Sequence, residues 1–336
     1  MALVISDTAY AGTFASYFWL PATFGMDTLQ KGGVYVQDGI KKTHTIGRLD
    51  FANPLQARQS TPTSSGTFTV DGRALTPQDL MLYTRFNPRD YEQHWLAEQL
   101  SPTLLARELP STAENYMMQI GLDRAFEQIE LGLWQGSKTY TAAPGSTGNG
   151  QLVFFDGYLK KMVNDAAVKQ VASPFTLTAA VTDGSHTNIV DAFNSLIQLC
   201  ATYKKALLSR VTRYKRLKFF VSINTEQIYQ TFITTTLTFK GVNTTEQGIN
   251  RFKGYEIVPL AGIPDDTIIF AEGLDDTSSN LYVGMNSTED NNLQLAKYRP
   301  DSEEFFLKGL MKFDVQYGFS EQVFLFTTLT TGSFTA

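Results

Sequence analysis

The residues that most often carry catalysis or bind metal ions are few and far apart in this chain of 336 residues. There are three histidines, His44, His94 and His186, and a single cysteine, Cys200. Structural zinc sites use ligands drawn mostly from cysteine and histidine, at short characteristic spacings that these residues do not have. The glycine-rich nucleotide-binding signatures and the nucleophile elbow of hydrolases are also missing from the sequence. We therefore expect no catalytic residue, no metal and no cofactor.

Two other groupings have a chemical interpretation beside a structural one. Cys200 and His186 could act as thiol and base, but Cys200 lies on one apolar helical stripe with Phe193 and Leu196, which favours a packed core thiol. The glycine-rich segment 145–150 could cradle a phosphate. However, no strand pattern precedes it and no Lys-Ser or Lys-Thr pair follows it, which favours a linker.

Charge is distributed unevenly along the chain, although the net charge is only −5. Residues 192–225 contain no acid, and residues 254–296 contain no base. Three interpretations remain: solvated faces with cations near a helix C-terminus, complementary contacts between copies of the chain, and phosphate contacts with nucleic acid. A weakly acidic chain lacks the overall positive charge expected of a protein whose main function is to bind nucleic acid. The charged residues selected as contact candidates are Arg210, Arg213, Lys215, Arg216, Asp265, Asp266, Asp275 and Asp276.

The composition is that of a globular protein with few charges. Hydrophobic residues make up 43% and charged residues 18% of the chain. The charged fraction is below that of ordinary soluble domains, which indicates that much of the polar surface is neutral or covered by partners. The apolar N-terminus has no basic residue before Lys31, so a secretion signal is not expected. No run reaches the roughly 18 apolar residues of a membrane span. We expect a soluble protein that is cytoplasmic when made.

The segment 46–70 has neither helical nor long strand periodicity, and it contains Pro54 and Pro62. Short alternating runs flank it within 33–85, as the two legs of a long hairpin would. Structureless loops longer than roughly 12 to 15 residues are uncommon in compact domains and are usually functional or disordered. A hairpin of this kind exposes apolar groups that only a neighbouring molecule can cover.

The clearest helix is expected to begin at a capping box formed by Ser111 and Glu114. An apolar stripe at spacings of three and four residues follows, and Gly136 is the natural stop. Such a helix has about 25 residues and is roughly 37 Å long, enough to span a domain. The stripe consists of Met118, Leu122, Ala125, Ile129 and Leu133.

The remaining chain mixes helix and strand patterns. A second helix is expected to begin near Asn188 and to carry Cys200 on its buried stripe. Strand patterns follow it, and the last of them is apolar throughout, as in a fully buried strand. These patterns lie at 217–223, 231–239, 255–260, 267–273, 311–317 and 323–326.

Several stretches together carry a resemblance to a known family. They are GIKKTHTIGRLD with LTPQDLMLYTRFNPRDYEQHW, STAENYMMQIGLDRAFEQIELGLWQG, RFKGYEIVPLAGIPDDTIIFAEGLDDTSSNLYVG and FFLKGLMKFDVQYGFSEQVFLF. Taken in order, they resemble the major capsid proteins of tailed double-stranded DNA phages, which have the Hong Kong 97-like fold. The resemblance spans nearly the whole chain.

The resemblance implies an α+β fold built from five parts. These are an N-terminal arm at 1–32, an extended β-hairpin called the E loop at 33–85, a peripheral (P) domain at 86–155 with the spine helix 111–136, an axial (A) domain with a central mixed sheet at 156–292, and C-terminal strands at 293–336 that return to the P domain. The E-loop residues expected to contact a neighbouring subunit are Leu49, Phe51, Leu55, Arg58 and Phe68.

It also implies a structural protein that forms the pentamers and hexamers of an icosahedral shell around a double-stranded DNA genome. Its location would be the virion capsid, after assembly in the bacterial host cytoplasm and without contact to a membrane. Its partners would be copies of itself, scaffolding, portal and minor capsid or decoration proteins, and packaged DNA through non-specific contacts. The charged candidates would lie between subunits or face the lumen, and reversing Arg213 and Arg216 to Glu should impair assembly more than folding.

Two alternatives to this function remain open on the sequence alone. An encapsulin-like nanocompartment subunit would share the fold and enclose protein cargo instead of a genome. A β-rich hydrolase or carbohydrate-binding protein belongs to another class and would use its Thr-rich and aromatic strands as a binding face.

Overall fold

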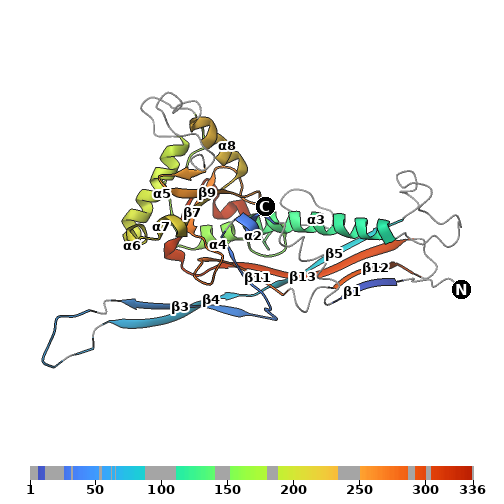
Figure 1. Ribbon diagram of the computed structural model, residues 1–336, viewed down its shortest axis with the longest axis horizontal. Helices are drawn as coiled ribbons and strands as arrows, with labels where there is room; N and C mark the ends of the chain where they lie inside the picture. The colour runs from blue at the N-terminus through green and yellow to red at the C-terminus, as the bar shows by residue number, and fades with distance from the viewer. Residues whose placement is uncertain are drawn as a thin grey trace.

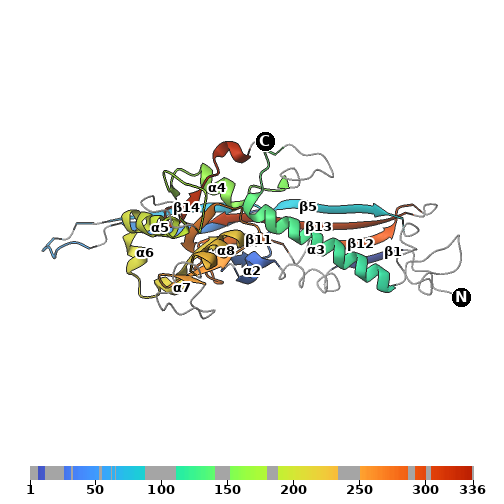
Figure 2. The same cartoon turned by 90° about the horizontal axis from the view of Figure 1, so that it is seen from above.

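A computed structural model shows an elongated molecule with two six-stranded sheets, one long helix and a projecting hairpin (Figures 1 and 2). The structure describes residues 7–11, 26–31, 33–52, 55–61, 63–64, 66–87, 111–140, 152–179, 188–233, 250–286, 292–299 and 304–334. His94, His186, the segment 145–150 and the side chains of Ser111 and Glu114 lie outside the described residues. Among the helices that are described, none combines the length and apolar character that a membrane span requires.

The first sheet is organised around one long strand, β13, which has buried side chains at alternating positions and pairs with three neighbours. Phe305, Leu307 and Phe313 are on the buried face. Because successive side chains of a strand point to opposite faces, this face is apolar while the other carries polar residues such as Lys308 and Lys312. The strands are β1 (Asp7–Ala11), β12 (Asn292–Lys297), β13 (Phe305–Tyr317), β11 (Leu281–Met285) and β2 (Tyr35–Gln37) in that order, with β5 (Gln78–Phe86) paired to β13.

The long helix α3 (Ser111–Gln135) lies along the apolar face of this sheet (Figure 2). Its stripe is buried as the spacing predicts, and Phe126 meets Phe313 edge to face at a ring separation of 6.2 Å. Gly121 faces Leu307 so closely that an added Cβ would lie 2.6 Å from the leucine side chain. The helix predicted over 111–136 is therefore confirmed, with its last residue one position earlier.

The second sheet lies at the end of the molecule that carries a group of helices, with which it shares a core (Figure 1). Every residue of β10 is buried, and Phe193 on α5 meets Phe219 on β7 at a ring separation of 4.8 Å. Asn188 caps α5 through a capping box, in agreement with the predicted start. The strands are β6 (Lys169–Gln170), β14 (Phe324–Thr327), β10 (Thr267–Glu272), β7 (Leu217–Val221), β9 (Tyr255–Pro259) and β8 (Arg251–Phe252), and the helices are α5 (Ile189–Tyr203), α6 (Lys205–Ser209), α7 (Arg213–Arg216) and α8 (Ile223–Phe232).

Short helices lie next to the long helix and after the long strands of the two sheets. The helix α4 (Tyr158–Asn164) contacts the C-terminal part of α3, and the 3-10 helices η6 (Ser320–Gln322) and η7 (Thr331–Phe334) follow β13 and β14. Gly262, in the turn between β9 and β10, lies so close to α3 that a Cβ would be 2.4 Å from a backbone oxygen of the helix. Only glycine fits this approach, which fixes the second sheet against α3.

Three sequence expectations are corrected by the topology. The C-terminal strands at 293–336 were all expected beside the long helix, but β14 enters the second sheet between β6 and β10. Within 156–292, α4 packs on α3 and β11 pairs with β13, so both belong with the first sheet. The strand expected at 231–239 is wrong at its start, because α8 continues through Phe232.

The short helix α2 (Asp27–Lys31) is attached to α3 by a buried carboxylate. The backbone N–H and the hydroxyl of Thr28 both donate to Glu130, whose exposed fraction is 6%. The indole N–H of Trp134 donates to the same hydroxyl at 2.7 Å. Burial raises the pKa of Glu130 above its usual value, although the hydrogen bonds from Thr28 act in the opposite direction.

Glu130→Gln should change how stability depends on pH. Since the folded-state pKa of Glu130 is raised, its contribution to stability is fully present below the ordinary pKa of 4.5 and is lost as pH rises through the raised value. Urea unfolding of the variant and the parent chain should show the variant gaining stability relative to the parent between pH 4.5 and neutral pH. A difference that is constant over this range would contradict the prediction.

Candidate interaction surface

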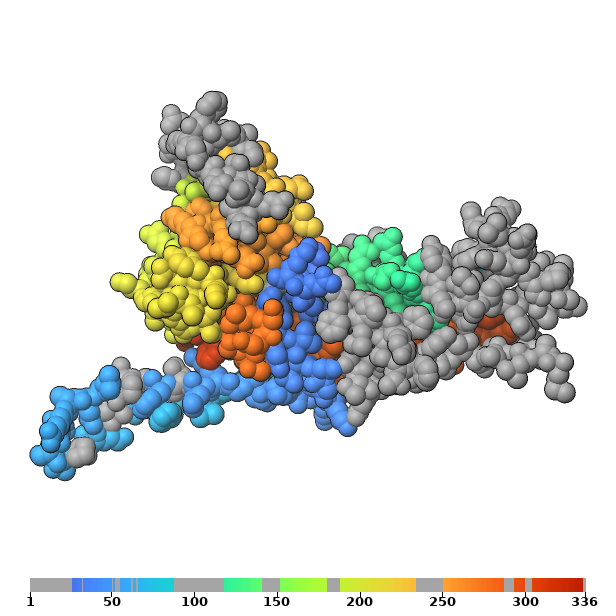
Figure 3. Space-filling view, in the orientation of Figure 1, coloured from blue at the N-terminus to red at the C-terminus, as the bar shows by residue number. Residues whose placement is uncertain are grey.

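The hairpin is formed by β3 (His44–Ala52) and β4 (Thr67–Leu75), which pair antiparallel over nine positions. It projects away from both sheets (Figure 3). Leu49 lies opposite Val70 and Phe51 opposite Phe68, and the two phenyl rings are stacked at 3.9 Å. A two-stranded hairpin by itself is only marginally stable in water, so further contacts are needed to hold its shape.

One face of the hairpin is apolar and exposed. The exposed fractions are 64% for Leu49, 39% for Phe51, 61% for Phe68 and 77% for Val70. Residues that pair directly across two strands share a face, so these four side chains form a continuous apolar stripe. An apolar stripe on a projecting arm marks a surface that a partner covers.

The connecting loop at the tip of the hairpin carries the other two predicted contact residues. Leu55 is 92% exposed, and Arg58 is exposed as well. The structure therefore places all five predicted contact residues on one projecting element. Val70 was not among the predicted contact residues, although it lies two positions after Phe68 in the same strand and therefore on the same face.

The opposite face of the hairpin carries cations that contact the body of the molecule. Arg73 forms an ion pair with Asp165 and lies over the ring of Tyr317, 4.4 Å from its centroid. Arg48 lies 3.6 Å from the carboxylate of Glu321. The apolar stripe must therefore point away from the body, because these cations alternate with the stripe residues along the strands.

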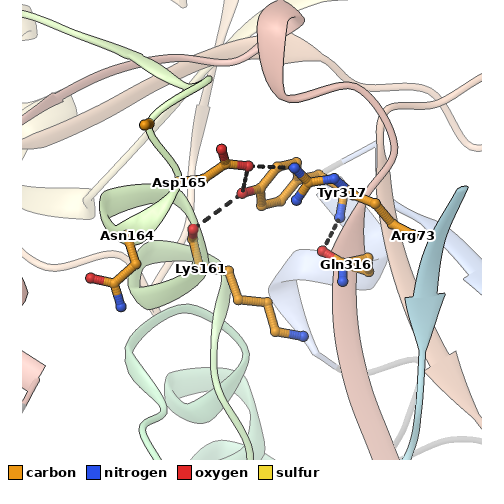
Figure 4. A pocket seen from close by; sticks show the side chains of 7 residues that line it. Arg73, Lys161, Asn164, Asp165, Gln316 and Tyr317 are labelled. Atoms are coloured by element: carbon orange, nitrogen blue, oxygen red, sulfur yellow. Dashed lines mark hydrogen bonds and ion pairs between the residues drawn. The ribbon is translucent and has the colours of Figure 1, made fainter. Parts of the chain in front are cut away.

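A shallow polar pocket of about 450 Å³ lies where the hairpin meets the body (Figure 4). Burial alone would raise the pKa of Asp165, but hydrogen bonds from the backbone N–H of Ala167 and from Arg73 hold it below the usual value. The Tyr317 hydroxyl donates to the same carboxylate at 2.9 Å, and burial raises the pKa of this tyrosine. A carboxylate held ionised by these donors is a poor proton acceptor at neutral pH. The pocket is lined by Arg73, Lys161, Asn164, Asp165, Ala166, Gln316 and Tyr317.

Two of the four candidate cations are used inside the subunit. Arg210 and Arg216 both bind the buried carboxylate of Glu272, at 2.7 Å and 3.1 Å. Arg213 instead lies over the ring of its neighbour Tyr214, 4.4 Å from the centroid. The basic and acidic stretches of the sequence therefore meet within one copy at Glu272, which gives Arg210 and Arg216 a structural role inside the subunit.

The four candidate acids lie in turns. Asp265 accepts a hydrogen bond from the hydroxyl of Ser222 at 2.8 Å, and Asp266 accepts one from a backbone N–H at 2.7 Å. Asp275 and Asp276 are exposed in the turn after β10. Asp276 also accepts a backbone N–H at 2.8 Å. These contacts give three of the acids a local structural role. A position between subunits or facing the lumen stays a prediction for all eight charged candidates.

The residues first considered for chemistry are not assembled into a site. Cys200 is buried in the second sheet's core, and burial raises its pKa to about 12, as expected for a packed core thiol. His44 is exposed at the start of β3. Within the described residues, no three His, Cys, Asp or Glu side chains are grouped as metal ligands would be.

Asn280 is a structural residue that no sequence pattern pointed to. It is 1% exposed. Its side-chain oxygen accepts a hydrogen bond from the backbone N–H of Phe319 at 2.6 Å, and its side-chain amide donates one to the backbone oxygen of Phe319 at 2.9 Å. The backbone N–H of Gly318 donates to the oxygen of Asn280 at 3.0 Å. These bonds fix the turn that follows β13, directly beneath the base of the hairpin.

Comparison with known proteins gives matches in structure alone. No protein-family model matches the chain, and no curated protein sequence matches it. Among solved structures, the capsid of Myoviridae phage XM1 is 15% identical, with 91% of this chain and 92% of that chain covered and a TM-score of 0.55. The procapsid of satellite phage P4 gives 10% identity, coverage of 94% and 90%, and a TM-score of 0.53. The chain has the phage capsid fold.

A third structure, that of Mycobacterium phage Adephagia, gives 13% identity, coverage of 90% of each chain and a TM-score of 0.51. About nine-tenths of this chain is matched in each of these two comparisons. The phage capsid fold therefore describes most of the chain.

Proposed function

We propose that this chain is the major capsid protein of a tailed phage with the Hong Kong 97-like fold. In this interpretation the β3–β4 hairpin is the E loop, α3 is the spine helix of the P domain, and the second sheet belongs to the A domain. The protein assembles into pentamers and hexamers of an icosahedral shell that encloses double-stranded DNA. It acts as a structural component of the virion capsid and not as an enzyme.

The observation that carries this proposal is the exposed apolar stripe on a projecting arm of a capsid fold. Each copy offers its stripe to a neighbour and receives a stripe from another copy, which is a heterologous contact that closes into rings. Covering the exposed parts of Leu49, Phe51, Phe68 and Val70 contributes about 4 to 7 kcal/mol. This is comparable to the entropic cost of association, roughly 4 to 15 kcal/mol, so a single contact is weak and stability comes from the closed ring.

Other partners follow from the same proposal. A shell of this class is expected to use scaffolding, portal and minor capsid or decoration proteins. Packaged DNA would be contacted without sequence specificity, through phosphate interactions of cations such as Lys215 on the exposed α7 surface. The capsid fold also favours a shell protein over a β-rich hydrolase or carbohydrate-binding protein.

The test is whether the purified chain forms closed particles. Analytical ultracentrifugation over a range of concentrations and salt should show large assemblies, and electron microscopy should show closed shells. Particles isolated with their contents should contain DNA and be wider than a few tens of nanometres. Small shells filled with protein would indicate a nanocompartment, and a chain that stays monomeric under all conditions would contradict both shell functions.

A further inference from the structure

Both inner-face arginines of the hairpin contact one short segment of the body, residues 317–321, at the end of β13 and the start of η6. Arg73 lies over Tyr317 and donates to the hydroxyl of Ser320 at 3.1 Å. Arg48 lies over Phe319, 5.2 Å from the ring centroid, and pairs with Glu321. The hairpin is therefore seated on this segment by contacts from each of its two strands.

The segment 317–321 also belongs to one of the connections between the two sheets. It links β13 in the first sheet to β14 in the second. Asn280, which directly precedes β11 of the first sheet, binds the backbone of Gly318 and Phe319 and fixes the path of the connection. A change in the angle between the sheets would therefore act on the same few residues on which the hairpin rests.

Glu321 has a second cationic partner on the side of the second sheet. Lys204, which follows α5, lies 2.5 Å from one carboxylate oxygen, while Arg48 lies 3.6 Å from the other. The pKa of Glu321 is lowered, mainly by Lys204 and to a smaller extent by Arg48. The carboxylate is therefore ionised at neutral pH. These side chains are 20% to 41% exposed, and ion pairs at such exposure add little to folding stability. Their effect is on the direction of the hairpin.

We propose that segment 317–321 is a coupling joint that makes the direction of the hairpin follow the orientation of the second sheet. Glu321 is the positioning residue, because it binds one cation from the hairpin and one from the helical layer over the second sheet. The inference concerns a single copy of the chain and does not depend on the proposed function.

The experiment measures the distance between the hairpin tip and α3 by pulsed electron paramagnetic resonance. Spin labels are attached to Gln59→Cys and Gln119→Cys, both at exposed positions. The native Cys200 is buried with a pKa of about 12, so it does not compete for the label. The labelled chain is diluted into an excess of unlabelled chain, so that only distances within one copy are measured.

The decisive variant is Lys204→Met, because Lys204 contacts Glu321 from outside the hairpin. We expect Lys204→Met and Glu321→Gln to broaden the distance distribution at least twofold, as Arg48→Met should. The matched control is Lys205→Met, which removes the adjacent exposed lysine and should leave the distribution unchanged. Circular dichroism confirms that each variant is folded.

Two outcomes would overturn the proposal. If Arg48→Met broadens the distribution while Lys204→Met matches the Lys205→Met control, the contact is a local latch and no coupling to the second sheet exists. If none of the variants broadens it, the segment does not set the hairpin direction. Loss of particle assembly without a change in these distances would bear on the proposed function and not on this joint.

Discussion

Val70→Asp is expected to prevent closed particles from forming while the subunit remains folded. The side chain is 77% exposed in one copy and belongs to the apolar stripe, so a carboxylate here meets water in the free subunit and loses it only when a neighbour covers the hairpin. A buried valine contributes about 1.5 to 3 kcal/mol, and 1.4 kcal/mol is a factor of ten in an equilibrium constant. The concentration needed for assembly should rise about tenfold or more.

The matched control is Thr67→Asp. Thr67 is in the same strand, is also exposed, pairs with Ala52 and points to the opposite face of the hairpin. Sedimentation velocity and electron microscopy should show particles for Thr67→Asp and free subunits for Val70→Asp, with the same thermal unfolding for both. Equal assembly of the two variants would show that the stripe is not the covered surface.

Arg216→Glu is expected to destabilise the subunit itself. The substitution places a second carboxylate against Glu272, whose side chain is 5% exposed, and leaves Arg210 as the remaining cation there. Removing one partner of a buried ion pair is costly because the other charge stays buried, and with Arg210 still in place we expect a loss of about 2 to 4 kcal/mol. Urea unfolding of the full chain measures it.

Arg213→Glu provides the comparison from the same short helix. Its side chain lies on the surface over Tyr214, so reversing its charge should change the free energy of unfolding little. The structure thus separates two residues that the sequence treated together, since reversing Arg216 should impair folding first. Equal destabilisation by both reversals would rule out the special role of Glu272.

Local patterns in the sequence were sufficient for the elements that depend on local spacing. The stripe at three and four residues gave α3 to within one residue, and a second stripe of the same spacing gave the start of α5 near Asn188. The start of the Thr-rich run at 231–239 was misleading, because β-branched residues favour strands while the helix capped by Ser222 continues through Phe232. Residues 234–239 lie outside the described residues. Thr225, Tyr229 and Phe232 are buried at helical spacing, a signal that was available in the sequence.

Contacts between residues and strands that are far apart in the sequence could not be predicted from local patterns. An apolar strand such as β14 carries no information on which sheet it joins, and it was assigned to the wrong one. The same limit applies to Glu272, which is separated by 62 and 56 residues from Arg210 and Arg216. The exposed apolar residues of the hairpin were found because their lack of local partners is itself a sequence signal.

The pairing of β13 has a consequence for mechanical load. This strand runs along the length of the first sheet (Figure 1) and pairs with β5 over nine positions, β12 over six and β11 over five. Ladder hydrogen bonds are perpendicular to the strands, so tension along β13 loads many of them together in shear. The subunit should therefore resist stretching along this axis, because the three neighbouring strands share the load.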